Sequence, residues 1–231
     1  MTTSNTYDFA PTITDLTLEA FERILLQPNQ LTVRHMHSAR ISANFVLQSW
    51  ANRGVNLWAV DLQEVPLEAE EPTYVLNPAT QNILDAYISI TDANGAVRDY
   101  PITPMGRTEY ADISRKADTG RPTQYWFERL IAPQITLWLV PDDIQTYTLK
   151  FYRMRRLQDA APVGGQGPDI HYRFTDAFAA ALAARLAEKF APAMLNDKIS
   201  LAMAAWREAS SEDNEHVDMH MTPDLTGYFI T

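Results

Sequence analysis

The sequence predicts an α+β protein: about four helices from the two chain ends form a helical body, and an antiparallel β domain is inserted between them. Apolar residues recur at helical spacing in the first 53 residues and again from residue 175. The part between is rich in Thr, Tyr, Trp, Phe and Ile, with alternating stretches typical of strands. Ten of the fourteen prolines fall between Pro66 and Pro168, where they suit turns and strand edges.

The first part, residues 1–54, predicts a polar arm and two helices. The arm ends at Pro11, and a helix over 13–27 ends at Pro28, which cannot continue it. A second helix over 32–53, closed by Gly54, carries one main apolar face. That face comprises Met36, Ala39, Ala43, Val46, Leu47 and Trp50. Ile41 and Phe45 fall outside this face, so we expect the helix to make contacts on two sides.

The second part, residues 55–156, predicts the antiparallel β domain. The pair Asn94-Gly95 between two strand-like runs indicates a hairpin, because both residues accept the left-handed backbone of a tight turn. A short helix over 106–115 interrupts the strands. The expected strands are 57–67, 74–76, 84–91, 96–103, 123–130, 135–140 and 146–155.

The third part, residues 157–216, returns to helix after a glycine-containing loop, which we interpret as a hinge. The helix over 175–190 holds many alanines, which favour helix and allow close approach of a neighbouring helix. Pro192 separates it from an amphipathic helix over 194–215. We assign the remainder, 217–231, to an extended C-terminal tail.

Composition excludes several classes of protein. The chain has no cysteine, which excludes disulfides, cysteine zinc sites and thiol catalysis. No apolar run approaches the roughly 18 residues of a membrane span, and we expect no membrane association. The N-terminus lacks the basic start and apolar run of a secretory signal. The formal net charge of −10 disfavours general adhesion to nucleic acid or anionic lipid.

No constellation in the sequence indicates catalysis, a metal or a cofactor, so we do not expect an enzyme. His35 and His37 diverge on their helix, and His216 and His220 lack a third ligand. The glutamates between 64 and 71 and the acidic residues after 211 suit solvated surfaces better than a carboxylate pair. Phosphate-binding and nucleophile-elbow motifs are missing from the sequence.

Three groups of side chains need interpretation, and two of them, the basic group and the apolar end of the tail, leave alternatives open. The basic residues Lys150, Arg153, Arg155 and Arg156 either face nucleic acid or, as we favour, pair with the acidic excess. The aromatic run Tyr125-Trp126-Phe127 places at least one ring away from its own sheet face. The apolar end of the tail either finds a partner surface or docks back on its own chain.

Several segments resemble the head-to-tail adaptor proteins of short-tailed bacteriophages over about residues 13–210. They are ANFVLQSWANRGVNLW (43–58), GRPTQYW (120–126), WLVPD (138–142) and the helix from Asp176 to Lys189. The order of helices, β insertion and helices also agrees with that family. The resemblance implies a structural virion protein without catalytic activity.

The resemblance further implies a ring of twelve copies below the portal protein, which carries a tail tube or nozzle protein and continues the DNA channel. It implies a place in the virion neck and assembly in the host cytoplasm. Family C-terminal segments reach toward the portal, so we expect Leu225, Tyr228, Phe229 and Ile230 to dock there. We expect Ile41, Phe45 and Ala181 to make ring contacts, since ring neighbours meet through two different surfaces. DNA would pass through the acidic lumen without specific binding.

The alternative function is a carbohydrate- or ligand-binding β module with helical decoration. Exposed aromatic side chains of the β domain would then stack on sugars. Size discriminates the two functions, because an adaptor forms a ring and a binding module stays a small oligomer.

Overall fold

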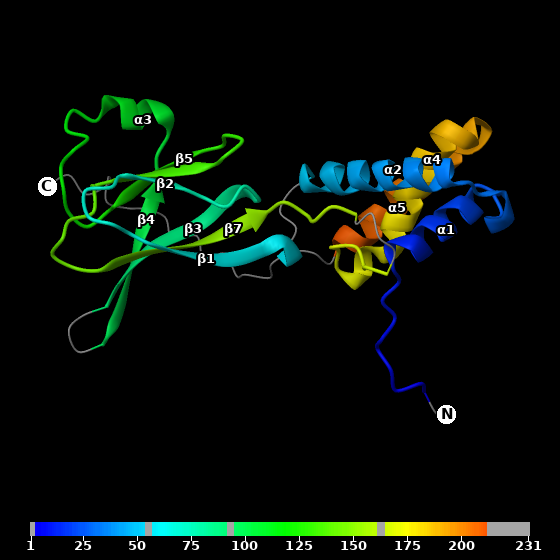
Figure 1. The fold of residues 1–231 in the computed structure, drawn as a ribbon, viewed down its shortest axis with the longest axis horizontal. Helices are drawn as coiled ribbons and strands as arrows, with labels where there is room; N and C mark the ends of the chain where they lie inside the picture. The colour runs from blue at the N-terminus through cyan, green and yellow to red at the C-terminus, as the bar shows by residue number, and fades with distance from the viewer. Residues whose placement is uncertain (1–2, 54–56, 92–94, 161–164, 212–231) are drawn as a thin grey trace, which may run out of the picture.

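The computed structural model describes residues 3–53, 57–91, 95–160 and 165–211. The molecule has two lobes joined by a narrow waist (Figure 1). One lobe is helical and comes from both chain ends, and the other is a curled sheet with one short helix. The predicted α+β class and the helical body built from the two chain ends are therefore confirmed.

Four helices make the helical lobe: α1 (Ile13–Arg23), α2 (Val33–Ala51), α4 (Thr175–Phe190) and α5 (Leu195–Ser211). Helix α1 starts with a capping box, in which the Thr12 side chain accepts from the Asp15 N–H and the Asp15 carboxylate accepts from the Thr12 N–H at 2.9 Å. Thr32 caps α2 similarly, with the His35 ring as the acceptor for the Thr32 N–H. These local bonds explain why the predicted helix starts were close to the observed ones.

Helix α4 lies at the centre of the helical lobe and contacts α1, α2 and α5. Its alanines allow this close packing, and most of them are fully buried. Trp50 of α2 fills the middle of the core, with ring centroids 5.9 Å from Phe178 and 4.7 Å from Trp206. One aromatic cluster and one alanine-rich helix, α4, therefore form the core of the helical lobe.

The β lobe contains a seven-stranded sheet in the order β1-β7-β3-β4-β5-β6-β2. Helix α3 (Arg107–Asp112) lies between β4 and β5 in the chain. The strands are β1 (Val60–Pro66), β2 (Thr73–Val75), β3 (Thr80–Thr91), β4 (Val97–Pro104), β5 (Gln124–Glu128), β6 (Gln134–Trp138) and β7 (Tyr147–Arg155).

The prediction of a purely antiparallel sheet was wrong at one pairing. Strands β4 and β5 pair in parallel, with Thr103 opposite Gln124 and Pro104 opposite Tyr125. The physical reason is the connection between them, which includes α3 and is long enough to return the chain to the same end of the sheet. The sheet is therefore mixed.

The predicted hairpin joins β3 and β4, which pair antiparallel from Ala86 with Ile102 to Thr91 with Val97. Gly95 has φ +80°, a left-handed conformation that glycine adopts without strain. Asn94 lies outside the described residues, as does Gly54.

The β lobe has a separate hydrophobic core, built from the inward side chains of the sheet. Ile88, Leu149 and Phe151 are fully buried at its centre. Of the consecutive aromatics, Tyr125 is buried in this core, and Trp126 stacks on Tyr110 of α3 with ring centroids 5.1 Å apart. None of the helices in the described part of the chain combines the length and the apolar character that crossing a bilayer requires.

Candidate assembly surfaces

All four residues of the basic group are held in ion pairs. Lys150 pairs with Glu64 at 3.0 Å and Arg156 with Asp159 at 3.0 Å. The guanidinium of Arg153, only 5% exposed, binds the Asp61 carboxylate at 2.7 Å and also donates to Thr80. Arg155 pairs with Asp169. The favoured alternative, pairing with the acidic excess, is confirmed.

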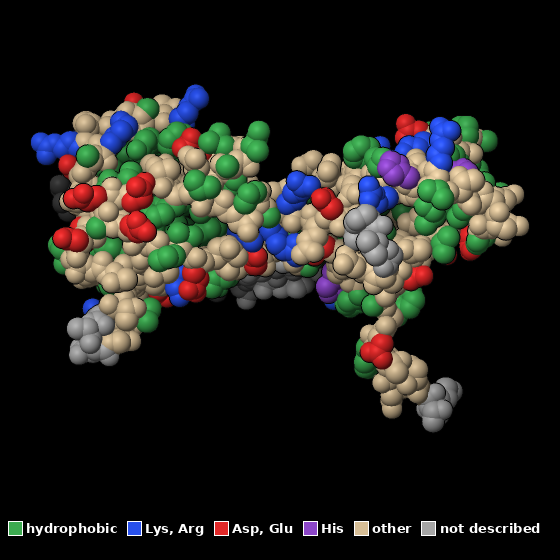
Figure 2. Space-filling model, viewed as in Figure 1, with side chains coloured by type: hydrophobic (Ala, Val, Ile, Leu, Met, Phe, Trp, Pro, Cys, Tyr) green, Lys and Arg blue, Asp and Glu red, His purple; other side chains and the backbone are tan. Residues whose placement is uncertain are grey.

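Asp169 links the two lobes at the waist through hydrogen bonds. Its carboxylate accepts from Arg155, at the end of β7, and from the Gln158 N–H at 2.9 Å. Its backbone carbonyl accepts from the Trp58 indole N–H at 3.3 Å. Figure 2 shows basic and acidic side chains side by side at this waist. The hydrogen bonds from Arg155 hold the pKa of Asp169 below its ordinary value, although partial burial opposes this.

Packing and a further hydrogen bond secure the same junction. The Trp58 ring lies 4.5 Å from the Phe174 ring, which belongs to the helical core. The Ala160 N–H donates to the Asn44 side chain of α2 at 2.8 Å. The two chain crossings between the lobes are therefore both anchored to the helical lobe.

The glycine-containing loop before α4, predicted to be a hinge, holds the start of α1. The Ile13 N–H donates to the Gln166 carbonyl at 2.9 Å. Gly165 takes φ +100°, and Gly164 lies outside the described residues. Gln166 of the loop therefore contacts the base of the N-terminal arm, and the interpretation as a hinge stays a prediction.

The helical lobe exposes apolar side chains along α2 and α5. On α2, Ile41 is 37% and Phe45 53% exposed, whereas the predicted core face from Ala39 to Trp50 is buried. On α5, Ile199, Leu201 and Met203 are exposed. Ile41 and Phe45 therefore lie outside the buried face of α2, and contacts on this second side stay a prediction.

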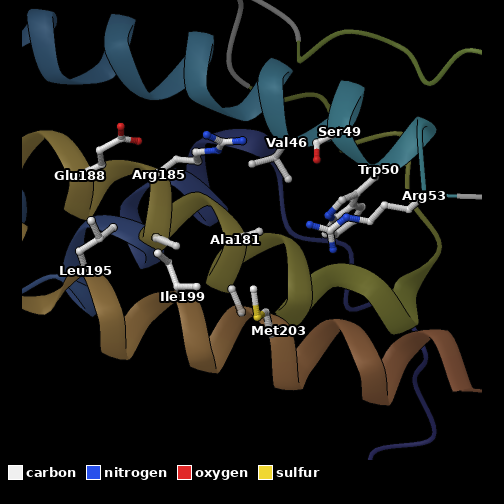
Figure 3. A pocket seen from close by; sticks show the side chains of 12 residues that line it. Val46, Ser49, Trp50, Arg53, Ala181, Arg185, Glu188, Leu195, Ile199 and Met203 are labelled. Atoms are coloured by element: carbon white, nitrogen blue, oxygen red, sulfur yellow. The ribbon is translucent and has the colours of Figure 1, made fainter.

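A groove lies between α2 and α5, with α4 as its floor, and has a volume of about 240 Å³. In Figure 3, Val46 and Ser49 come from α2, and Ile199 and Met203 rise from α5 toward α4. Ala181 and Ala184 of α4 form the floor. We call this feature the α2/α5 groove. Phe45 lies on the same face of α2 as Ser49, since residues four apart share a helix face.

The charged residues of the α2/α5 groove are Arg53, Arg185 and Glu188, and all three are exposed. The Arg53 guanidinium lies over the Trp206 ring at 4.8 Å from its centroid. The groove is therefore apolar at its floor and positive by one charge at its mouth, in a chain whose net charge is −10.

The structure brings only part of the predicted site together. Ala181 lies in the groove, Phe45 lies one turn from the groove residue Ser49 on α2, and Ile41 lies one turn from Phe45. Ala184 shares the groove floor with Ala181, whereas Ala177, Ala179, Ala183 and Ala187 of α4 are buried in the core of the helical lobe. The predicted portal-docking residues Leu225, Tyr228, Phe229 and Ile230 lie outside the described residues, as do His216 and His220.

Of the described histidines, His35 has a structural role. The His35 ring caps α2 and packs 4.8 Å from the Phe190 ring. Across residues 3–53, 57–91, 95–160 and 165–211, no three His, Asp or Glu side chains gather closely enough to hold a metal ion.

Sequence reasoning missed Asp169 and the residues of α5 that line the groove. One feature of the sequence could have indicated Asp169. It lies between Pro168 and an apolar residue, in the loop that follows several arginines. No local feature of the sequence could have indicated the groove, because its walls come from segments about 150 residues apart in the chain.

No curated protein sequence matches this chain. The family model of the SU10 adaptor protein matches residues 11–224, which include both lobes. That family consists of structural adaptor proteins of bacteriophages. The chain therefore belongs to the SU10 adaptor protein family.

Proposed function

We propose that the chain is the subunit of a ring, of twelve copies, that lies below the portal of a short-tailed bacteriophage. The ring connects the capsid to the tail and continues the DNA channel. One observation carries this proposal within the adaptor family: the helical lobe leaves Phe45 and Met203 exposed on two helices that flank an open groove. Exposed apolar patches of this kind mark surfaces that a partner covers.

The position of these surfaces supports a ring contact. A ring forms when one surface of a subunit meets a different surface of its neighbour and the rotation closes. The α2 face with Ile41 and Phe45 offers one such surface, and the α2/α5 groove with Ala181 extends it. We therefore place the ring contacts in the helical lobe.

The charge distribution supports passage of DNA without specific binding. Each cation that neutralises a phosphate adds affinity, so a channel through which DNA moves is better without free cations. The basic group at the end of β7 is already paired with carboxylates, and the chain has a net charge of −10. The DNA would slide past an acidic subunit.

The remaining partners follow from the same proposal. The C-terminal tail, 217–231, docks on the portal through Leu225, Tyr228, Phe229 and Ile230, and the far end of the ring carries the tail tube or nozzle protein. The subunit comprises the helical body of 1–54 and 157–216 and the inserted domain of 55–156, which the two separate hydrophobic cores support. The protein acts in the neck of the virion after assembly in the host cytoplasm.

The carbohydrate-binding alternative has less support. It needs exposed aromatic platforms on the β lobe, but Tyr125 is buried and Trp126 is covered by Tyr110. Tyr152 of β7 is about half exposed and stands apart from these rings in the sequence.

The test is the mass of the assembly. The purified protein, alone and mixed with the portal ring of its own phage, is measured by mass photometry and imaged by cryo-electron microscopy. The proposal predicts closed rings, at least on the portal. A protein that stays a monomer or dimer with the portal present contradicts it.

A further inference from the structure

The N-terminal arm, residues 3–11, leaves the helical lobe and carries two uncovered aromatic side chains. Tyr7 is 100% and Phe9 85% exposed. Figure 1 shows the arm extending away from both lobes. Fully extended, nine residues reach about 30 Å, enough to contact a neighbouring copy.

The arm starts on the side of α4 opposite the α2/α5 groove. Its base, with Phe9 and Pro11, borders a hollow against α1 that includes Ala179 of α4. The groove floor includes Ala181 of α4. Residues two apart on a helix point about 200° apart, since 3.6 residues make one turn. The arm and the groove therefore face opposite directions on one subunit, the arrangement that a head-to-tail contact between copies requires.

The size of the groove suits the arm. An enclosed cavity of about 150 Å³ holds a benzene ring. The groove, with about 240 Å³, has room for one aromatic ring and part of a second. In an extended segment, side chains two apart point to the same face, so Tyr7 and Phe9 can enter the groove together.

The charges are also complementary. When Tyr7 and Phe9 point toward the groove floor, Asp8 between them points to the mouth. The mouth carries Arg53, Arg185 and Glu188 and is positive by one charge. Asp8 is the only charged side chain of residues 3–11, so the arm is negative by one charge.

We infer that Tyr7 and Phe9 of one copy dock in the α2/α5 groove of the next copy, with Asp8 facing Arg53 and Arg185. This inference deepens the proposed ring and rests on it. It assigns the groove to a second copy of this chain rather than to the portal or to DNA. Because each copy gives an arm and receives one, the contact repeats around a closed ring.

Disulfide trapping tests the inference cleanly, because the 231-residue sequence has no cysteine of its own. Phe9→Cys and Ala184→Cys are made as separate single variants with different affinity tags, mixed with the portal and mildly oxidised. The expected result is a covalent heterodimer that carries both tags. Ser200→Cys, on an exposed face of α5, replaces Ala184→Cys as the matched control and should give at least tenfold less heterodimer.

The double variant Phe9→Cys/Ala184→Cys separates contacts between copies from contacts within one. A ladder of covalent multimers is expected, and a compact monomer that forms no multimers overturns the inference. Selective trapping of Ala184→Cys with Ile131→Cys, at the exposed turn after β5, or with Tyr228→Cys in the tail, and not with Phe9→Cys, also overturns it.

The variant Tyr7→Ala/Phe9→Ala gives an independent readout. We expect it to raise the protein concentration needed for half-assembly by about tenfold or more, as for loss of central aromatic contacts. Rings that form normally without this arm contact overturn the inference but leave the proposed function standing. Trapped chains that never close into rings support the arm contact and contradict the proposed ring.

Discussion

The two lobes differ in where their apolar side chains are exposed and in how their charged side chains are paired. The β lobe pairs its buried and half-buried charges within the chain, as Arg153 does with Asp61, and stacks Trp126 on Tyr110. The helical lobe leaves Phe45 and Met203 uncovered on either side of an open groove. Both lobes expose apolar side chains, among them Ile131 and Ile144 in the β lobe, but in the helical lobe two of the helices that carry them flank the α2/α5 groove. We therefore propose that the contacts between copies lie in the helical lobe, on the side of this groove.

The largest expected effect on the stability of the free subunit comes from Trp50→Ala. Trp50 is buried among Phe174, Phe178 and Trp206, so its removal leaves a large cavity in the helical core. We expect a loss of about 3–5 kcal/mol in the free energy of unfolding. Urea denaturation followed by circular dichroism measures it.

Trp126→Ala in the β lobe is the matched control for Trp50→Ala. This ring is only partly buried and has one stacking partner, so we expect a loss of about 1 kcal/mol. Equal losses of unfolding free energy in the two variants would show that the aromatic cluster around Trp50 stabilises the protein no more than the stacked pair of Trp126 and Tyr110.

The next effect is at the waist. Asp169→Asn removes the ion pair with Arg155, whose two side chains are 18% and 20% exposed, and we expect a loss of about 1–2 kcal/mol. Asp159→Asn breaks a pair of 65% and 51% exposed side chains and should cost under about 0.5 kcal/mol. Similar losses in the two variants, measured by urea denaturation, would contradict a special role of Asp169.

The same pair gives a pH dependence. Folding lowers the pKa of Asp169 from its ordinary value of 3.8, chiefly because Arg155 donates hydrogen bonds to its carboxylate. The stabilisation is therefore complete above that ordinary value and is lost as the pH falls through the lower folded pKa. The unfolding free energy of the wild type minus that of Asp169→Asn should shrink below about pH 4. A difference that stays constant down to pH 2 would contradict this.

Phe45→Glu should change stability by less than about 0.5 kcal/mol, since the side chain is half exposed. It should nevertheless prevent ring assembly, because a charge would be buried against the neighbour. Ala181→Glu in the groove should have the same effect on assembly. Ile144→Glu, at a more exposed apolar position of the β lobe, is the control and should assemble normally. Mass photometry with the portal present measures ring assembly of all three variants. Normal rings from Phe45→Glu and Ala181→Glu would refute the proposed contacts.

The smallest effect on the free subunit comes from deletion of residues 222–231. We expect its unfolding free energy to stay within about 0.5 kcal/mol of the wild type. Pull-down on the portal should instead show loss of binding, because Tyr228, Phe229 and Ile230 would no longer be buried there. Wild-type retention of the truncated protein on the portal would defeat the docking proposal.

Local patterns in the sequence predicted the elements of both lobes well. The apolar spacing of α2 separated its buried face from Ile41 and Phe45, and Asn94-Gly95 predicted the connection of β3 and β4. Pairing between distant strands was harder: the parallel contact of β4 with β5 depends on how the connection through α3 turns back, and no local residue specifies that.

The candidate surface could be predicted only in part for the same reason. Phe45 is visible as a residue outside the helical core face, within one helix. The groove requires α2, α4 and α5 to be placed together, and Asp169 acquires its role only when Arg155 and Trp58 lie beside it. Spacing along the chain contains no information on such contacts.

A cryo-electron microscopy reconstruction of the protein on its portal tests most directly whether the helical lobe makes the contacts between copies. We expect Phe45 and Met203 to be buried between neighbouring subunits, while Ile144 of the β lobe stays exposed. A ring held together by contacts between β lobes, with the α2 and α5 flank open to solvent, would contradict it.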